Sequence, residues 1–569
     1  MAGTWQPLAN QPPFAASTML LLTDGTVMAQ SSGARDWWKL TPDAAGDYVK
    51  GTWTQLASMA HSRLYFASAV LADGRVFVAG GEYSDGGSEF NGVEIYDPVV
   101  DTWTTIPGPG WANIGDAVSC VLADGRLLLG NLFGNSTAIF DPITETWTAG
   151  PTKDDASEEE TWTLLPDGTV LTVECSNIPK AEKYVPSSNS WVSAGTTPSP
   201  IAEASMSEIG PALLLPDGRL FCVGGTGHTA LYTRPANPMS PGTWTSGPDF
   251  PESPPASGQL MKANDAPGCL LPNGKVLCTA GPAGATGFAS PTHFFEYDPA
   301  TNVLSSVPTP PNAGGVVYAG RMLLVPTGQV FYASGGPDLE VYTPSGGPQA
   351  SWKPVITSHP TQIEAGVSYS LSGHQLNGLS QAVSYGDDAQ MATNYPLVRI
   401  RYPGGKVVYA RTFDHSTMAV ATGSAPTSTN FFVPWNAPKG PAELCLVANG
   451  ISSDCVKVHV KRHRIHIPHW EEYEAWNWLI GSLSDGPLWV IGPHGPHPVD
   501  PLDAALAARA KQAHATIRQG IDELEVLGRE VQAQRAAVYS EAISTRPSGE
   551  RRRKAEAMAK VKTKTAAKA

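Results

Sequence analysis

Long apolar runs are missing from this sequence. The longest, such as TMLLL near residue 20, are far too short to cross a bilayer. The N-terminal stretch MAGTWQPLANQPPF lacks the basic start and apolar core of a Sec signal peptide. We therefore expect no transmembrane segment, and a protein that is either cytoplasmic or exported by a route other than Sec.

Charged residues are scarce, and the charge is mostly negative. They make up 16% of the chain, and 52 acidic residues outnumber 38 basic ones, for a formal net charge of −14. This balance argues against a nucleic-acid-binding role for the chain as a whole. A dense cluster of basic residues stands at the C-terminal end, where residues 551–569 contain eight Lys and Arg and a single acid, Glu556.

Cysteine is also rare. Seven cysteines, an odd number, exclude a complete disulfide framework within one chain. Cys269 and Cys278 flank one predicted hairpin turn, and Cys445 and Cys455 flank another. Each pair could face across two strands, and buried free thiols fit the pattern equally well, so the redox compartment stays open.

Glycine and proline are abundant, with 57 and 50 copies, which predicts a turn-rich and mostly β fold. One short element recurs seven times: an apolar run, then Asp, Asn or Thr followed by Gly, then an alternating run, as in AVLADGRVFVAGG. The turn glycines are Gly25, Gly74, Gly125, Gly168, Gly218, Gly274 and Gly328, spaced 43 to 56 residues apart. Such a period indicates a repeat architecture.

Each repeat has the pattern of a β-hairpin, because Asp-Gly supplies the positive φ angles of a tight turn. Most continue into an outer hairpin such as IYDPVVDTW or IFDPITETW. Two hairpins make a four-stranded blade, so the sequence predicts a seven-bladed kelch-type β-propeller over residues 1–352. Trp5 lies in an extra strand-like segment that we expect to complete the seventh blade, with Trp352 as the alternative.

The pattern changes after the propeller. Residues 353–460 contain alternating strands such as LVRIRYPGG and AELCLVANG, which predict an immunoglobulin-like β-sandwich, again all-β. Residues 461–500 form a His-, Pro- and Trp-rich linker, 501–545 an amphipathic α-helix, and 546–569 a basic disordered tail. The helix could mediate homo-oligomerisation or bind an assembly partner. A nucleic acid or an anionic surface would bind only through the tail.

The stretches SRLYFASAVLADGRVFVAGG and VVYAGRMLLVPTGQVFYASGG, with the sandwich strands, resemble the galactose oxidase and glyoxal oxidase family over about residues 1–460. The resemblance implies one copper ion held by two tyrosines and two histidines, with one tyrosine crosslinked to a cysteine. Tyr65 matches the crosslinked tyrosine, and Tyr318 matches the axial one.

Other positions of that motif depart from the family. Ala319 stands where one copper histidine is expected, and Ala15 is the best match to the crosslinking cysteine. The second histidine position matches Ala410, with His415 nearby but out of register. Copper(II) prefers imidazole ligands, so these departures argue against a copper-radical oxidase.

The repeat itself indicates a different site. Eight or nine residues before the successive turns the chain places Tyr65, Asp116, Glu159, Glu208, Asp265 and Tyr318, whereas the first blade has Ala15 or Ala16. Equivalent positions of a propeller form a ring about its axis, and we expect Arg63 to lie in the same axial pocket. Hard oxygen donors suit calcium or magnesium, so the candidate metal ligands are Asp116, Glu159, Glu208 and Asp265.

Two interpretations of this ring remain. In one, it is a solvated propeller mouth whose acids pair with Arg63 and Lys262. In the other, it is an axial site for a divalent cation, or for a cationic or polyhydroxy ligand. The corresponding functions are a non-catalytic module that binds a protein or glycan on the propeller face, and an enzyme. The enzyme would be a calcium-dependent hydrolase or lactonase, or, with less support, a divergent copper-radical oxidase.

Overall fold

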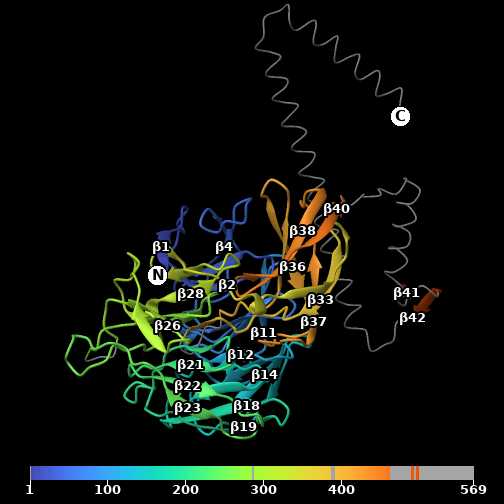
Figure 1. The fold of residues 1–569 in the computed structure, drawn as a ribbon. Coiled ribbons are helices and arrows are strands. Elements are labelled where there is room, and N and C mark those ends of the chain that lie inside the picture. The colour runs from blue at the N-terminus through green and yellow to red at the C-terminus, as the bar shows by residue number, and fades with distance from the viewer. Residues whose placement is uncertain (1, 285–287, 386–390, 462–488, 493–494, 499–569) are drawn as a thin grey trace, which may run out of the picture. The chain divides into compact units, whose positions relative to one another are not determined.

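A computed structural model describes residues 2–284, 288–385, 391–461, 489–492 and 495–498 (Figure 1). Two compact units make up the chain, residues 1–463 and residues 464–569. The predicted helix at 501–545 and the tail at 546–569 lie outside the described residues. Within the predicted linker, strand β41 (Trp489–Gly492) pairs with β42 (Gly495–Pro498), a hairpin that the sequence analysis did not anticipate.

The first unit begins with a seven-bladed propeller of four-stranded antiparallel blades, as the repeat predicts. Blade 1 consists of β2 (Ala16–Leu21), β3 (Val27–Ser31), β4 (Trp37–Thr41) and β5 (Thr52–Gln55). Blade 2 consists of β6 (Ala67–Val70), β7 (Val76–Ala79), β10 (Val93–Asp97) and β11 (Thr102–Ile106), with the small hairpin β8 (Glu82–Ser84) and β9 (Gly87–Glu89) inserted. Blade 3 consists of β12 (Ser119–Val121), β13 (Leu127–Gly130), β14 (Thr137–Asp141) and β15 (Thr146–Ala149).

The remaining blades repeat this order from the inner to the outer strand. Blade 4 consists of β16 (Thr163–Leu164), β17 (Val170–Val173), β18 (Lys180–Val185) and β19 (Ser190–Thr196). Blade 5 consists of β20 (Ala212–Leu214), β21 (Leu220–Val223), β22 (Thr229–Thr233) and β23 (Thr243–Ser246). Blade 6 consists of β24 (Pro267–Leu270), β25 (Val276–Ala280), β26 (His293–Asp298) and β27 (Val303–Ser306). Blade 7 consists of the 3-10 turn η1 (Val317–Ala319), β28 (Arg321–Leu324), β29 (Val330–Ala333), β30 (Leu339–Thr343) and β1 (Thr4–Pro7).

Strand β1 closes the ring. It pairs antiparallel with β30, with Trp5 opposite Tyr342, so the first strand of the chain is the outermost strand of the last blade. The closure predicted for Trp5 is therefore confirmed. Trp352 lies instead in the 3-10 turn η2 (Ala350–Trp352), where its ring packs against the turn at Gly274.

The seven predicted turn glycines all adopt positive φ, between 76° and 89°. A side chain is strained in that region, which is why glycine recurs there. The inner strands that these turns join are almost entirely buried. The alternating pattern that defined the repeat thus reflects packing between neighbouring blades.

A second β-rich part, here called the C-terminal β-domain, spans residues 355–461 (Figure 1, yellow to orange). Its strands are β31 (Val355–Ser358), β32 (Gln362–Glu364), β33 (Ser368–His374), β34 (Val383–Tyr385), β35 (Leu397–Arg401), β36 (Val407–Phe413), β37 (Pro426–Phe432), β38 (Gly440–Ala448), β39 (Ile451–Ser452) and β40 (Val456–Lys461). All but β34 belong to one sheet that is antiparallel except where β32 meets β40. It has its own apolar core, which includes Val398, Phe431 and Leu444.

The C-terminal β-domain packs on the face that carries the Asp-Gly turns. The Thr412 amide donates to the Thr23 carbonyl at 3.0 Å, and the Met418 amide donates to the Ala123 carbonyl at 2.9 Å. These carbonyls belong to the inner turns of blades 1 and 3. Chain segments far apart in the sequence therefore share hydrogen bonds across this contact.

One segment of the C-terminal β-domain reaches the centre of the propeller. Strand β34 adds to the inner edge of blade 6, where Val383 pairs with Cys269 of β24. Its last residue, Tyr385, donates its hydroxyl to the Tyr318 carbonyl at 2.6 Å. The propeller centre is thus built partly from a residue outside the repeats.

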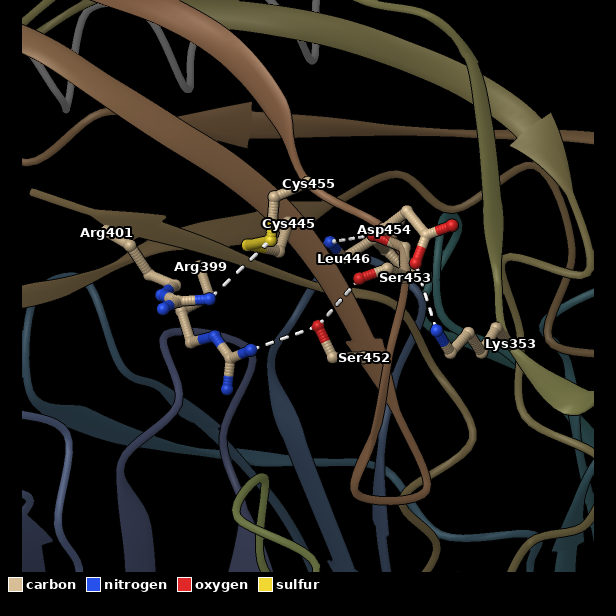
Figure 2. Close-up of a disulfide and its surroundings, with 9 residues drawn as sticks. All are labelled: Lys353, Arg399, Arg401, Cys445, Leu446, Ser452, Ser453, Asp454 and Cys455. Carbon is tan, nitrogen blue, oxygen red and sulfur yellow. Dashed lines mark hydrogen bonds and ion pairs between the residues drawn. A yellow bond between two sulfur atoms is a disulfide. The ribbon is translucent and has the colours of Figure 1, made fainter. Parts of the chain in front are cut away.

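The described residues contain one disulfide, between Cys445 and Cys455 (Figure 2). It closes the hairpin between β38 and β40, and Arg401 Nη1 lies 3.9 Å from Cys455 Sγ. At the hairpin tip, Asn449 accepts a hydrogen bond from the Ser380 amide at 3.3 Å and so contacts the segment that leads into β34.

The other candidate pair does not form a disulfide. Cys269 and Cys278 are buried free thiols, as are Cys120, Cys175 and Cys222. Burial raises the pKa of each of these five thiols, so they are poor nucleophiles. We assign them to packing.

Replacing Cys445 and Cys455 together with serine should lower the free energy of unfolding by about 2–4 kcal/mol, because the crosslink restricts the unfolded chain. Urea unfolding with and without a dithiol reductant measures the effect. The reductant should destabilise the wild type and leave the double variant unchanged. Equal unfolding midpoints for the oxidised wild type and the variant would contradict the prediction.

No helix among the residues that the structure describes is both long and apolar enough to span a membrane.

Candidate functional site

One cavity of about 340 Å³ contains the six side chains that the repeat analysis selected. They are Tyr65, Asp116, Glu159, Glu208, Asp265 and Tyr318, and each precedes the inner strand of its own blade. Because inner strands surround the propeller axis, six consecutive blades contribute one residue each to an axial cavity. The corresponding residue of blade 1, Ala16, begins β2 and is buried.

Three of these residues share an uncommon backbone conformation. Tyr65, Glu159 and Asp265 have φ values of 47°, 57° and 49°. Left-handed backbone costs a non-glycine residue about 1–2 kcal/mol and is concentrated at ligand sites. The same strained geometry at three equivalent positions indicates that surrounding contacts hold these connections in place.

Three carboxylates meet at one side of the cavity. Glu159, Glu208 and Asp265 each place an oxygen within 4.8 Å of the others. Burial raises the pKa of the Asp265 carboxyl, and this increase is opposed by a hydrogen bond with Glu208 and by the charge of Arg321. Carboxylates this close repel one another, so they share protons or require a nearby cation.

Arg321 places a guanidinium beside the cavity wall. Its central carbon lies 3.4 Å from the ring centroid of Tyr385 and 5.4 Å from that of Tyr65. The same guanidinium donates through Nη1 to the Tyr318 and Gly320 carbonyls, at 2.7 and 2.9 Å. Tyrosine faces next to the cavity therefore already contact a cation.

Aromatic rings make up most of the rest of the wall. Tyr318 meets Tyr65 and Phe288 edge to face, with centroids 6.4 and 5.1 Å apart. Tyr83, whose exposed fraction is 68%, is also in the lining, and a hydrogen bond with Glu82 raises the pKa of its phenol to about 12. The cavity thus combines acids with aromatic faces.

The expectation for Arg63 is wrong. Its side chain is fully buried within blade 2 and pairs with Glu94 at 2.6 Å. It also donates to the carbonyls of Gly80 and Gly92. A guanidinium without solvent needs several acceptors, and blade 2 supplies them, so Arg63 does not line the cavity.

His415, the histidine nearest in sequence to the second copper-ligand position, also lies outside the axial cavity. His415 contacts Thr429 Oγ1 at 2.9 Å, and its amide donates to the Ala72 carbonyl at an inner turn. Burial lowers the pKa of His415 to about 3, so the ring is neutral. His415 and Ala410, another candidate position, are both absent from the cavity lining.

Several residues of the site were missed by the sequence analysis. They are Glu82, Tyr83, Phe288, Arg321 and Tyr385. Glu82 and Tyr83 directly follow the Gly-Gly pair that ends the inner hairpin of blade 2. Comparing the residues after this hairpin in every repeat could have identified them. Tyr385 comes from the C-terminal β-domain, and no repeat pattern points to it.

A second acidic group lies in blade 4 and surrounds a lysine. Lys153 Nζ lies 2.7 Å from Glu160, 2.9 Å from Glu182 and 3.4 Å from Asp155, and the exposed fraction of all four side chains is 8% or less. The ammonium also lies 5.4 Å from the ring centroid of Trp191. Here the protein itself supplies a cation to its buried acids.

Burial shifts the pKa of Lys153 and the pKa of its acidic partner Glu160. It lowers the pKa of Lys153, but the surrounding carboxylates raise it more, so the lysine stays charged. Burial raises the pKa of Glu160 to about 7, against the charge of Lys153. The ammonium is therefore what allows several acids to remain in the interior.

Comparisons with known proteins place a kelch motif at residues 63–110. A galactose oxidase of Gibberella zeae is 43% identical over 61 residues, which cover 11% of this chain and 9% of that protein. The F-box/kelch-repeat protein SKIP30 of Arabidopsis thaliana is 44% identical over 61 residues, covering 11% and 17%. The Kelch-like protein terF of Aspergillus terreus is 33% identical over 88 residues, covering 15% and 19%. The chain thus spans less than a fifth of the length of these curated relatives.

Among solved structures, a fungal alcohol oxidase of the AA5 family in complex with copper matches with a TM-score of 0.47. Its identity is 16%, and the match covers 81% of this chain and 99% of that one. A catalytically inactive virginiamycin B lyase from Staphylococcus aureus, with quinupristin, matches with a TM-score of 0.42 and 12% identity, covering 60% and 99%. The protein is therefore a seven-bladed propeller that contains a kelch motif and is similar to galactose oxidase over a short stretch.

Proposed function

We propose that this protein is a non-catalytic binding module whose axial cavity accepts the cationic group of a ligand. One observation carries the proposal: five acidic side chains from separate segments line a single cavity of about 340 Å³. They are Glu82, Asp116, Glu159, Glu208 and Asp265. A bound cation would relieve their mutual repulsion, so binding energy is available to a ligand of that charge.

The rest of such a ligand would contact the surrounding propeller face. Tyr83 lies in the lining and is largely exposed, so it offers an aromatic surface to a protein or glycan larger than the cavity. On this proposal the C-terminal β-domain is an immunoglobulin-like sandwich that braces the site, because its strand β34 supplies Tyr385. The extra domain would then shape the site as well as stabilise the ring.

The donor set fits a hard cation better than copper. The described residues that line the cavity offer carboxylate and phenol oxygens, and neither histidine nor cysteine is among them. Copper(II) prefers imidazole, whereas calcium and magnesium prefer carboxylate oxygen. The candidate calcium ligands are therefore the carboxylate oxygens of Glu159, Glu208 and Asp265, together with Asp116, which lines the same cavity. We propose no copper-radical activity.

A calcium-dependent hydrolase or lactonase is the second candidate. The observation that favours it is the approach of three carboxylates from different blades to within 4.8 Å. An ion bound there would activate water, and a neighbouring carboxylate such as Asp116 would accept its proton. Ester or lactone hydrolysis that requires calcium would support this function over simple binding.

The double variant Glu208→Gln/Asp265→Asn tests the proposal. We expect the wild type to bind a member of a cation panel that includes Ca²⁺, Mg²⁺ and 1,4-diaminobutane. Affinity in the variant should fall at least roughly 100-fold, because two charge-assisted contacts, each contributing about 1.5–3 kcal/mol, are lost. Isothermal titration calorimetry measures both affinities.

The matched control is Asp124→Asn/Asp217→Asn, which makes the same change in net charge at two exposed inner turns. The control should bind as the wild type does. Failure of the wild type to bind any cation of the panel would contradict the proposed function. An equal loss in the control would assign the effect to overall charge and would contradict it as well.

A further inference from the structure

We infer that the ligand of the axial cavity presents a primary ammonium group on an alkyl chain, as a lysine side chain or an alkyl diamine does, rather than a bare metal ion. The inference rests on the proposed function, because it specifies the class of cation that the same cavity would accept. Three independent features of the structure support it: the size of the cavity, the composition of its wall, and two cations that the protein already binds within itself.

The cavity is large for a metal ion. Its volume of about 340 Å³ corresponds to roughly eleven water molecules at about 30 Å³ each. A divalent ion held by three carboxylates would occupy one corner and leave most of this space to solvent. Pockets for small organic ligands begin at about 300 Å³, so the volume matches an alkyl chain with a charged head.

The wall also contains more than metal ligands. Among the eleven lining residues, five are acids and five are aromatic. The aromatic ones are Tyr65, Tyr83, Phe288, Tyr318 and Tyr385. A hard metal ion is bound through oxygen atoms and gains little from ring faces, whereas an alkylammonium gains from both the carboxylates and the rings.

The first internal cation is the Arg321 guanidinium. It lies against the Tyr385 ring and within 5.4 Å of the Tyr65 ring, and both rings belong to the cavity wall. Tyrosine faces at this site therefore contact an organic nitrogen cation in the folded protein. The contact is a cation–π interaction, which a nitrogen cation of a ligand would make with another ring of the same wall.

The second internal cation, Lys153, shows the complete arrangement. Its primary ammonium lies among Asp155, Glu160 and Glu182, with the Trp191 ring 5.4 Å away. Three carboxylates and an aromatic ring thus bind one alkylammonium in blade 4. The axial cavity presents the same two kinds of group, carboxylates from neighbouring blades and aromatic rings, around a space that a ligand can enter.

A primary ammonium suits this wall better than a quaternary one. It carries three N–H donors, and one charge-assisted hydrogen bond to a carboxylate contributes about 1.5–3 kcal/mol. A quaternary ammonium retains the cation–π attraction but has no donor for Glu159, Glu208 or Asp265. The predicted order of affinity is 1,4-diaminobutane above tetramethylammonium.

Calorimetric titration of the full-length protein tests the inference with 1,4-diaminobutane, tetramethylammonium and Ca²⁺. Phe288→Leu removes a ring face but leaves every acid in place, so affinity for the diamine should fall roughly 3- to 30-fold while affinity for Ca²⁺ is unchanged. Phe133→Leu is the matched control, because Phe133 is exposed and does not line the cavity. Diamine affinity in this control should equal that of the wild type.

The outcomes separate the two proposals. Ca²⁺ binding that depends on Glu208 and Asp265, without diamine binding, would overturn this inference and leave the proposed function standing. Diamine binding that Phe288→Leu does not weaken, or that tetramethylammonium matches, would also overturn it. Binding of no cation at all would remove the proposed function and this inference together.

Discussion

Replacing Lys153 with methionine should lower the free energy of unfolding by about 3–5 kcal/mol. The substitution removes the ammonium from Asp155, Glu160 and Glu182, whose side chains are at least 92% buried. Removing one partner of a buried ion pair leaves uncompensated charge in the interior, which costs about this much. Urea unfolding at pH 7 measures the loss.

The deficit should depend on pH. Burial raises the pKa of Glu160 to about 7 even beside Lys153, and without the lysine the pKa of this group should rise further. A carboxyl whose folded pKa exceeds its unfolded value stabilises the fold below the unfolded pKa and loses that contribution as pH rises through the folded pKa. The Lys153→Met deficit should therefore be smallest near pH 4.5 and grow toward pH 8.

Lys180→Met is the matched control. Lys180 also forms an ion pair, with Asp154 at 2.9 Å, but the two side chains are 52% and 56% exposed. An exposed pair contributes about 0–1 kcal/mol, so the control should unfold almost as the wild type does. Similar losses in the two variants, or a Lys153→Met deficit independent of pH, would refute this account of blade 4.

Replacing Arg63 with methionine should cost a similar amount, about 3–5 kcal/mol, without changing cation affinity at the axial cavity. Arg63 pairs with Glu94 at 2.6 Å, and their side chains are 0% and 2% exposed. The variant removes the guanidinium that neutralises the Glu94 carboxylate and takes one hydrogen bond from each of the Gly80 and Gly92 carbonyls. Thermal or urea unfolding measures the loss, and calorimetry measures the affinity.

Two further variants make this prediction specific. Arg63→Met/Glu94→Gln removes both charges and should recover part of the stability, because no unpaired carboxylate remains. Arg126→Met, at a pair that is 38% and 50% exposed, should cost at most about 1 kcal/mol. A large loss of cation affinity in a folded Arg63→Met protein would show that Arg63 acts on the cavity after all.

Local sequence was sufficient for the architecture of the propeller. Each turn needs glycine for its positive φ, each inner strand needs apolar residues on both faces, and these requirements recur every 43 to 56 residues. Because every blade satisfies them alone, seven turns predicted seven blades, and a strand-like segment at Trp5 predicted the closure with β30. The six selected cavity positions followed from the same repetition, although what they bind stays a prediction.

The tertiary structure decided what the repeat could not express. Arg63 and Tyr65 are two residues apart, yet Arg63 is buried in blade 2 and Tyr65 lines the cavity. The position of the Arg63 side chain depends on the hydrogen-bond acceptors that surround it in the folded blade, and the repeat pattern does not specify them. Tyr385 reaches the axis only through the pairing of β34 with β24, more than 110 residues earlier in the chain. The cysteine pairing was equally undetermined: Cys445 of β38 bonds to Cys455, which directly precedes β40, whereas Cys269 and Cys278 lie on the paired strands β24 and β25 and stay free thiols. Turn chemistry and strand period depend on a few consecutive residues, whereas these contacts depend on segments that meet only after the ring has closed.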